Sequence, residues 1–501
     1  MPEFTDEQKQ ILRKHVSNLD RDVYLVYNLP PEVVAVLFAY VSRSPASFRE
    51  NLLKLILGKE LDMGRLIEVN QDQGLDYQEA REKAMKFHEK WVVGYGHGSV
   101  AEHAMASIAL ENISILATKV VEDNRLASYT EKSTRYQVFD RNRYYKPKRL
   151  MESRFGKLYE DTCNHLFDVY VELTPHMFEY MRKKYPKPEE MKDGLYESVT
   201  KARACDAIRY LLPASTLTNL GMTVNARNLE HAIRKLLSHP LEEMRDMGTD
   251  IKTEVQKVIP VLVKYAEYNK YIHDTNQGME KHQIQDTPQN NDVVRLVEYD
   301  RDAENKIVSS ILYKYSKNPY QQIREKVAGM SQEGKKKVLD DYLKGMDRHD
   351  WPMRELEHTN YTFDILMDYG AFRDVQRHRI CTQTNQDVTT DHDYEIPQDL
   401  VDAGFKDKFV ECMEKARHAF EEIRKEFPKD AQYVVPLAYK KRTLIAWNLR
   451  SLCHFIKLRS SKQGHESYRR IARMCYQEVK KVHPLLAEYI QVDMSEGPAR
   501  G

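Results

Sequence analysis

Four short motifs occur in the same order in the two halves of this 501-residue chain. The matching segments are residues 40–45 and 314–319, 102–103 and 357–358, 212–213 and 435–436, and 225–229 and 448–452. A single match of this kind arises easily by chance, but four in the same order indicate a duplicated unit. We therefore predict two copies of one domain. The offset between the copies falls from 274 to 223 residues, so the second copy is the shorter one.

A polar run near the middle of the chain, residues 275–292, separates the two copies. It contains Gly278 and Pro288, residue types that favour loops. Three segments follow from this break: a first domain at residues 1–275, a linker or surface loop at 276–292, and a second domain at 293–501.

Apolar residues recur every three or four positions over most of the sequence, for example in residues 157–185 and 407–427. Alternation of apolar and polar residues is scarce, and Gly and Pro, at 19 each, are too few for a sheet-and-turn architecture. The sequence therefore predicts a mostly helical protein.

The charge balance supplies no global attraction to nucleic acid or to an anionic membrane, because Lys and Arg total 77 and Asp and Glu total 76. The longest apolar stretch, residues 33–41, is about half the length of a membrane span. We expect a local anion-binding surface and no membrane contact. A basic stretch near the C-terminus comprises Arg450, Lys457, Arg459, Lys462, Arg469, Arg470 and Arg473. Its spacing fits solvated helix faces, so nucleic-acid binding is a minor alternative.

The six cysteines lie far apart and form no Cys-x-x-Cys pair, which argues against a disulfide framework. The first residues carry neither a basic leader nor an apolar core, so no signal peptide is expected there. Both features favour a cytoplasmic protein.

Residues 96–103 form the first segment that can carry chemistry. Ser99 and Glu102 have the spacing of a capping box, which predicts the start of a long apolar helix. The amides at such a helix start, with the glycine-rich residues 94–98, can bind a phosphate. The alternative is a turn shaped by the glycines, with His103 packed in the core.

Two further segments concentrate fixed charge. Residues 125–136 combine hydroxyl groups with arginine and glutamate, which suits either an anion site or a solvated turn. The second copy contains Arg377-His378-Arg379, where two arginines can make bidentate phosphate contacts around a titratable histidine. The alternative for this tripeptide is a basic helix face.

Together these motifs resemble the flavin-dependent thymidylate synthases, over most of residues 30–250 and 294–485. That family carries Arg-His-Arg, two residues, Ser, one residue, Asn-Glu, one residue, Ser, one residue, Arg-Tyr. The resemblance implies two tandem copies of a helix-rich α+β domain. It also implies FAD as the cofactor, dUMP as the nucleotide substrate, and methylenetetrahydrofolate and NADPH as co-substrates. The family usually forms homotetramers with active sites at subunit interfaces.

The two copies depart from the signature in opposite ways. The first copy reads Asp123-Asn124-Arg125 in the Arg-His-Arg slot and Thr130 in place of the Asn, but it keeps Ser128, Glu131, Ser133, Arg135 and Tyr136. The second copy keeps Arg377-His378-Arg379 and loses the rest, reading Thr382, Thr384, Asn385, Asp387, Thr389 and Thr390. Two downstream arginines are likewise each kept in one copy only. The first copy keeps Arg209 where the second has Gln432, and the second keeps Arg459 where the first has Leu236.

These complementary losses predict one composite site and one inactive reciprocal site. The composite site joins Glu131, Ser133, Arg135 and Arg209 of the first copy to Arg377, His378, Arg379 and Arg459 of the second. The first set is expected to hold a nucleoside monophosphate, and Arg-His-Arg the phosphates of the flavin cofactor. The resemblance assigns Arg459 the catalytic role of polarising a pyrimidine carbonyl. A homodimer of this chain would then mimic the family tetramer with half of its sites.

The resemblance also implies further cofactor-binding residues, namely His97, Ser99, Asn225, Arg227, Asn448 and Arg450. Three departures bear on activity. Asp387 replaces a serine and would repel a phosphate that it faced. Asp374 replaces a glutamine of the family, and Pro352 and Arg354 replace the His and Ser of its flavin-binding segment.

Two other classes of function stay open. A catalytically degenerate copy can persist as a nucleotide- or flavin-binding scaffold, or as a flavin enzyme with another substrate. The other class is metal-dependent chemistry at His349, Asp350, His378, Asp391, His392 and Asp393. For that set a solvated loop is the favoured interpretation.

Overall fold

The computed structural model describes residues 3–41, 44–57, 99–284, 292–347 and 349–496. The chain divides into two compact units that do not coincide with its two sequence halves. Unit 1 comprises residues 1–112, 124–131 and 219–284, and unit 2 comprises residues 113–123, 132–218 and 285–501. A large part of the first copy therefore belongs to the same unit as the whole second copy.

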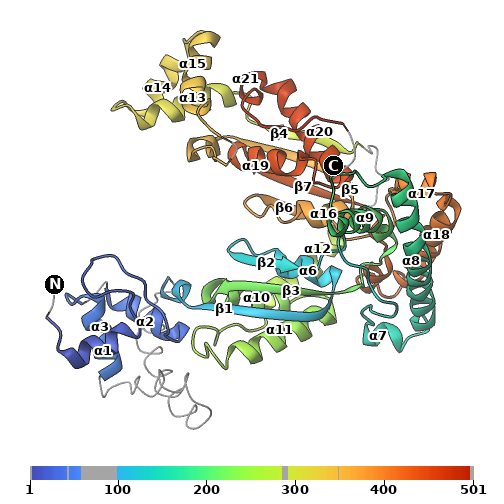
Figure 1. The fold of residues 1–501 in the computed structure, drawn as a ribbon, viewed down its shortest axis with the longest axis horizontal. Helices are drawn as coiled ribbons and strands as arrows, with labels where there is room; N and C mark the ends of the chain where they lie inside the picture. The colour runs from blue at the N-terminus through green and yellow to red at the C-terminus, as the bar shows by residue number, and fades with distance from the viewer. Residues whose placement is uncertain (1–2, 42–43, 58–98, 285–291, 348, 497–501) are drawn as a thin grey trace. The chain divides into compact units, whose positions relative to one another are not determined.

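Unit 1 combines an N-terminal helical cluster with most of a small sheet (Figure 1). Its helices and strands are α1 (Asp6–Arg13), α2 (Pro31–Val41), α3 (Phe48–Leu57), η2 (Val100–His103), β1 (Met105–Ser114), β2 (Ala127–Glu131), β3 (Leu217–Asn225), α10 (Ala226–Leu237), α11 (Glu242–Val255), α12 (Lys270–Met279) and η4 (Glu280–His282). The N-terminal helices bury Leu12, Val33 and Leu52 against one another. The strand order of the sheet is β1-β3-β2.

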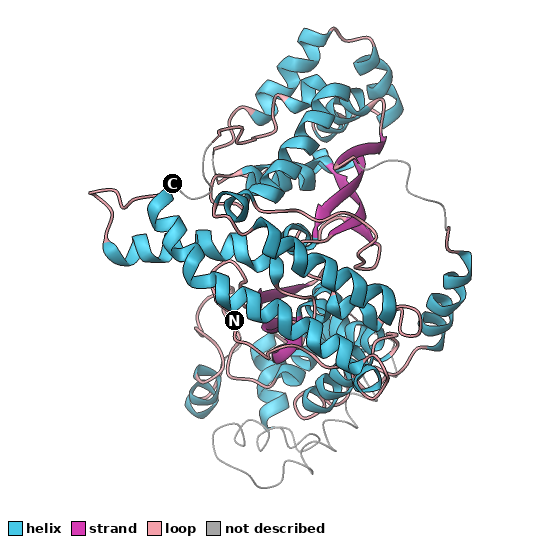
Figure 2. Cartoon of the chain, turned by 90° about the vertical axis from the view of Figure 1, so that its right-hand side faces the viewer, coloured by secondary structure: helices cyan, strands magenta, loops and turns pink. Residues whose placement is uncertain are grey.

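Unit 2 is built around a second sheet with the strand order β4-β5-β7-β6. Its first-copy helices are α6 (Ile115–Glu122), α7 (Lys148–Met151), α8 (Gly156–Lys184), α9 (Asp193–Ile208) and η3 (Arg209–Leu211). Its second-copy elements are β4 (Val294–Tyr299), α13 (Ala303–Lys314), α14 (Tyr320–Ala328), α15 (Gln332–Leu343), η5 (Arg354–His358), β5 (Asn360–Asp368), α16 (Tyr369–Val375), β6 (Thr382–Asn385), α17 (Gln398–Asp402), α18 (Lys406–Ile423), η6 (Asp430–Val434), β7 (Lys440–Asn448), α19 (Leu449–Ser460), α20 (Glu466–Val482) and α21 (Pro484–Ala487). Helices predominate over strands in the described chain (Figure 2).

The predicted duplication is confirmed by the strand pairing. The order β1-β3-β2 recurs as β5-β7-β6, with β4 added at the edge. The registers also agree, since Glu131 lies opposite Leu220 in the first copy and Asn385 lies opposite Thr443 in the second. The predicted helices at 157–185 and 407–427 are confirmed as α8 and α18. The fold is therefore helix-rich α+β in two tandem copies.

The matched asparagines of the two copies begin equivalent helices. The side chain of Asn225 accepts a hydrogen bond from the backbone of Asn228 at 2.9 Å and caps α10. The side chain of Asn448 accepts one from Ser451 at 2.8 Å and caps α19. Because an Asn at this position satisfies a helix amide that has no other partner, the recurring Asn motif is explained by capping.

The two Leu-Pro and Val-Pro motifs meet inside unit 2. Pro213 and Pro436 form an isolated antiparallel bridge. The flanking backbone groups exchange hydrogen bonds symmetrically. The amides of 214 and 437 donate to the carbonyls of 435 and 212, both at 2.9 Å. The amides of 215 and 438 donate to the carbonyls of 433 and 210, at 3.0 and 3.2 Å. Each residue of one copy thus repeats the contact of its counterpart, which gives unit 2 a local two-fold pseudosymmetry about these prolines.

The predicted helix beginning near residue 99 is wrong. Residues 100–103 form only the short η2, and the following segment is β1. Ser99 makes no side-chain capping bond, so the capping box does not form. Short apolar runs do not distinguish helix from strand by periodicity alone, and pairing with β3 supplies the backbone partners of this segment. Residues 94–98, including His97, lie outside the described residues.

The polar run at 275–292 begins within α12, where every residue is at least partly exposed. Residues 285–291 of the run lie outside the described part of the chain. Among the described helices, none is long and apolar enough to span a membrane. All six cysteines are buried free thiols.

Removing the cap of α19 should destabilise its first turn. We expect Asn448→Ala to lower the free energy of unfolding by about 1 kcal/mol and to speed hydrogen exchange at the Ser451 amide, because that amide loses its acceptor. Asn448→Ser, which keeps an acceptor oxygen, is the control and should change both little. Equal exchange rates in the wild type and Asn448→Ala would show that the cap contributes nothing.

Candidate functional site

Arginines from both copies come together in unit 2. Arg135 follows β2 and Arg209 begins η3, and both come from the first copy. Arg377 follows α16 and Arg459 lies near the end of α19, and both come from the second copy. We call these four residues, with Asp206 and Asp374, the arginine cluster. Its four guanidinium groups and two carboxylates leave two positive charges in excess.

Asp374 is the centre of the arginine cluster. Its buried carboxylate contacts Arg377, lies 3.5 Å from Nη1 of Arg459, and lies 3.8 Å from Nη1 of Arg209. Burial raises the pKa of Asp374, but the charges of Arg377, Arg459 and Arg209 outweigh burial and hold the pKa far below its ordinary value. Asp374 therefore stays ionised and links η3 of the first copy to α16 and α19 of the second.

Arg135 is held by a bidentate pair with Asp206. Its Nε and Nη2 donate to the two carboxylate oxygens of Asp206 at 2.8 and 2.9 Å, and its Nη1 donates to the Tyr468 hydroxyl at 2.6 Å. The guanidinium carbons of Arg135 and Arg459 lie 5.5 and 5.4 Å from the centre of the Tyr468 ring. Tyr468 thereby connects an arginine of each copy. Burial lowers the pKa of Arg135, and Asp206 more than compensates and raises it.

Arg209 is the most deeply buried member, with 2% of its side chain exposed. Its Nε and Nη2 are buried and have no hydrogen-bond partner among the described residues. Buried donors are normally bonded, and leaving one unbonded is costly. Two nitrogens of a buried cation that have no acceptor are therefore suited to receive an anion.

His378 is neutral in this arrangement. Its Nε2 accepts a hydrogen bond from Nε of Arg459 at 2.8 Å, so this ring nitrogen carries no proton. Burial, followed by the charge of Arg459, lowers the pKa of His378 well below its ordinary value. The Nδ1–H group is then the donor that the ring offers, and the contact orients the Arg459 guanidinium.

The reciprocal location, where the counterparts of the arginine cluster lie once the two copies are exchanged, carries different charges. Asp123, the counterpart of Arg377, pairs with Lys119 at 2.9 Å. Gln432, the counterpart of Arg209, accepts a hydrogen bond from the backbone of Val388 at 3.0 Å. Asp387 pairs with Lys429 at 2.9 Å.

The remaining predicted residues have separate structural roles. Ser133 lies in unit 2, where its Oγ accepts from the amide of Arg135 at 3.2 Å. Arg379 is partly exposed and follows His378. Arg450 donates to the carbonyl of Pro352 at 2.7 Å and to Glu357 at 3.1 Å. Unit 1 contains the other described candidates, Ser99, Glu131, Asn225 and Arg227, and Arg227 pairs with Glu102 at 2.5 Å.

Asp206, Tyr468 and His465 were missed by the sequence analysis. His465 accepts from the amide of Ser467 at 3.2 Å, and burial together with the charge of Arg209 lowers its pKa to about 3. None of these residues belongs to the signature, and no local spacing connects position 206 with position 465. Only the folded chain brings them to Arg135 and Arg209.

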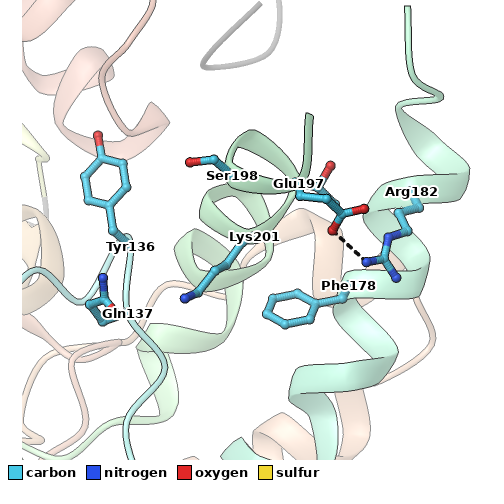
Figure 3. Close-up of a pocket in the computed structure, with 8 residues that line it drawn as sticks. Tyr136, Gln137, Phe178, Arg182, Glu197, Ser198 and Lys201 are labelled. Atoms are coloured by element: carbon cyan, nitrogen blue, oxygen red, sulfur yellow. Dashed lines mark hydrogen bonds and ion pairs between the residues drawn. The ribbon is translucent and has the colours of Figure 1, made fainter. Parts of the chain in front are cut away.

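A pocket of about 500 Å³ lies beside the segment that follows Arg135 (Figure 3). It is lined by Tyr136, Gln137, Phe178, Arg182, Glu197, Ser198, Thr200 and Lys201, and its Arg182 and Glu197 pair at 2.8 Å. The lining comes from α8, α9 and the loop before them. The arginine cluster itself does not line this pocket.

The possible metal ligands do not assemble. Within the described ranges, no group of three or more His, Cys, Asp or Glu side chains is arranged to hold a metal ion. Asp391 instead pairs with Arg424 at 2.6 Å, and Nε2 of His378 accepts a hydrogen bond from Arg459. The metal-dependent alternative has no support from the described geometry.

A duplicated, helix-rich α+β domain with an arginine cluster shared between its copies is the class of protein that these features define. The family model described as thymidylate synthase complementing protein matches residues 33–261 and again residues 295–485. These matches cover more than half of the chain, and the chain therefore belongs to this family.

Relatives divide into full-length and single-copy matches. A UPF0159 protein of Chlamydia pneumoniae is 38% identical over 515 residues, which cover 99% of this chain and 96% of that protein. A UPF0159 protein of Thermoplasma acidophilum is 28% identical over 460 residues, covering 84% and 92%. The flavin-dependent thymidylate synthase of Clostridium tetani is 27% identical over 194 residues, covering 37% of this chain and 72% of that protein. The last match has about the length of one copy.

Removing the central carboxylate should destabilise unit 2. We expect Asp374→Asn to lower the free energy of unfolding at pH 7 by about 3 kcal/mol, because the arginines lose their buried counter-ion. The depressed pKa means that this stabilisation is complete above the ordinary carboxyl pKa of about 4 and is lost as the pH falls through the folded-state value. The difference between the proteins in urea unfolding should therefore shrink in acid.

Asp387→Asn is the matched control. Its carboxylate is half-exposed and pairs with a single lysine, so the loss should stay within about 1 kcal/mol. A comparable loss from both substitutions would contradict the central role of Asp374.

Proposed function

We propose that this chain is a flavin-dependent thymidylate synthase-like enzyme that uses FAD and one composite site per chain. Its reaction is the reductive methylation of dUMP to dTMP, with methylenetetrahydrofolate and NADPH as co-substrates. Family membership supports the reaction type, and the arginine cluster supports the location. The single observation that carries the proposal is the buried guanidinium of Arg209, whose unbonded N–H groups lie within a cluster of excess positive charge.

The charges of the cluster suit a nucleoside monophosphate. A phosphate monoester carries close to two negative charges at neutral pH, which matches the two positive charges in excess. Arg209 would donate to the phosphate from its unbonded nitrogens. The Ser133 oxygen already accepts from the amide of Arg135, so its hydroxyl hydrogen stays available for a phosphate oxygen.

The second copy provides the cofactor side of the site. Arg377 is 44% exposed and Arg379 is partly exposed, so both can reach the phosphates of a dinucleotide. FAD, when bound, supplies the hydride chemistry. Arg459, oriented by His378, would donate from its guanidinium to a pyrimidine carbonyl. Glu131 remains a proposed nucleotide-binding residue, and the proposed cofactor-binding residues remain His97, Ser99, Asn225, Arg227, Asn448 and Arg450.

The second candidate is a nucleotide- or flavin-binding protein without catalysis, or a flavin enzyme with another substrate. Asp374 favours it, because its carboxylate already engages three arginines at a position where the family has glutamine. Release of tritium from labelled dUMP in the presence of FAD, NADPH and methylenetetrahydrofolate separates the candidates. Flavin binding without tritium release would support the second one.

The proposed assembly is a homodimer, in which four copies of the domain reproduce the number in the family tetramer. We place it in the cytoplasm, where six buried free thiols stay reduced.

Of the two Arg-His-Arg slots, only the one in the second copy should be needed for flavin binding. We expect Arg377→Ala to lose the flavin absorbance of the protein reconstituted with FAD, because a phosphate partner is removed. Asp123→Ala, at the equivalent position of the first copy, should retain it. Equal loss from both substitutions would refute the division of labour between the copies.

Nucleotide binding should depend on the first-copy arginine. We expect Arg209→Gln to weaken dUMP binding by roughly 10- to 100-fold in calorimetry, since one charged hydrogen bond contributes about 1.5–3 kcal/mol. Glutamine is the residue that the second copy carries at this position, so the fold should accept it. Gln432→Ala is the control and should leave the affinity unchanged. Unaltered binding by Arg209→Gln would place the nucleotide elsewhere.

A further inference from the structure

Lys441 is a buried lysine in β7 of unit 2, with 4% of the residue exposed. No hydrogen bond or ion pair joins its ammonium group to any residue within the described ranges. The two-fold relation between the copies makes Thr218 its counterpart, and the Thr218 hydroxyl bonds the carbonyl of Lys132 at 3.4 Å. The second copy therefore carries an unpaired amine where the first carries a bonded hydroxyl. A buried lysine without a hydrogen-bond or ion-pair partner is rare, because burying its charge is costly.

Aromatic rings and a second lysine surround this amine. The Lys441 nitrogen lies 4.4 Å from the ring centre of Phe372 and 5.6 Å from that of Tyr369. The nitrogen of Lys119 lies 6.0 Å from the same Phe372 ring centre. Lys119 is paired with Asp123 at 2.9 Å. Two amines thus share one ring, and only one of them has a carboxylate partner.

The charges around Lys441 favour its neutral form. Burial, followed by the positive charge of Lys119, lowers the pKa of Lys441 to about 7. Asp387 opposes this effect from the segment after β6, but its carboxylate is engaged by Lys429 at 2.9 Å. Near neutral pH a large share of Lys441 therefore carries a free lone pair, whereas an ordinary lysine is almost wholly protonated.

We propose that Lys441 is a carbamylation site that takes up carbon dioxide, with Lys119 as the cation that faces the product. The nitrogen lone pair attacks the carbon of carbon dioxide and forms an N–C bond, while one C=O electron pair moves onto oxygen. The nitrogen then releases one proton to water, which leaves a carbamate with one negative charge. No oxidant or further reactant is needed.

The surroundings select this electrophile and this product. With so little of Lys441 exposed, small and apolar carbon dioxide is the electrophile best suited to reach its nitrogen. The positive charge of Lys119 repels the protonated Lys441 amine. The reaction converts this amine into a negatively charged carbamate, which Lys119 attracts. The site lies at the reciprocal location and depends on neither flavin nor nucleotide binding.

The test is alkylative trapping of the intact protein. The purified full-length chain is equilibrated with ¹³C-bicarbonate at pH 8, treated with a trialkyloxonium salt that esterifies carbamates, digested and examined by mass spectrometry. We expect the labelled alkoxycarbonyl group on the peptide that contains Lys441. The label on Lys119 in place of Lys441 would overturn the proposal, and so would the absence of any carbamate signal in ¹³C nuclear magnetic resonance, which needs no reagent to reach the site.

Matched variants test the roles of the two lysines. In ¹³C nuclear magnetic resonance, the carbamate signal should vanish in Lys441→Met and persist in Lys440→Met, the adjacent lysine of the same strand. Lys119→Met should decrease the signal at saturating pH, because the cation that faces the carbamate is lost. The wild-type signal should rise with pH around about 7. A signal that survives Lys441→Met would contradict the assignment.

Discussion

The buried carboxylate of Asp374 is the interaction on which the candidate site depends. A single negative charge holds Arg377, Arg459 and Arg209, which come from three separate segments and from both copies of the domain. Without it, cations would face each other in a region with little water, where their repulsion is strong. Asp374 thus permits the cluster to exist before any ligand arrives. It also sets the excess charge that an incoming anion experiences.

The two-fold pseudosymmetry of unit 2 explains why the arginine cluster and the reciprocal location share one backbone arrangement although their side chains differ. The backbone exchange around Pro213 and Pro436 repeats each contact of one copy in the other. The side chains do not repeat. One location gathers arginines around Asp374, while the other contains Lys119 and Lys441 and has Gln432 and Asp123 in place of Arg209 and Arg377. Divergence after duplication has altered charge while preserving the hydrogen-bonded frame.

The sequence predicted the duplication, the helix-rich character and the arginines that come together. These predictions rested on motif order and on long periodic helices such as α8, which local patterns report well. The strand β1 was misread as a helix because its apolar spacing fits either structure and only pairing with β3 decides between them. Asp206 and Tyr468 escaped detection because they contact Arg135 from distant positions of the chain. Sequence also could not reveal that Asp374, seen as a mere departure from the family, occupies the centre of the cluster.

The central claim is that each chain holds one site, built from complementary halves, and not two. Calorimetric titration of the FAD-reconstituted protein with dUMP tests it most directly, because the integrated heat gives the number of sites. The account predicts one dUMP per chain. Two equivalent sites per chain, or no binding in the presence of flavin, would contradict it.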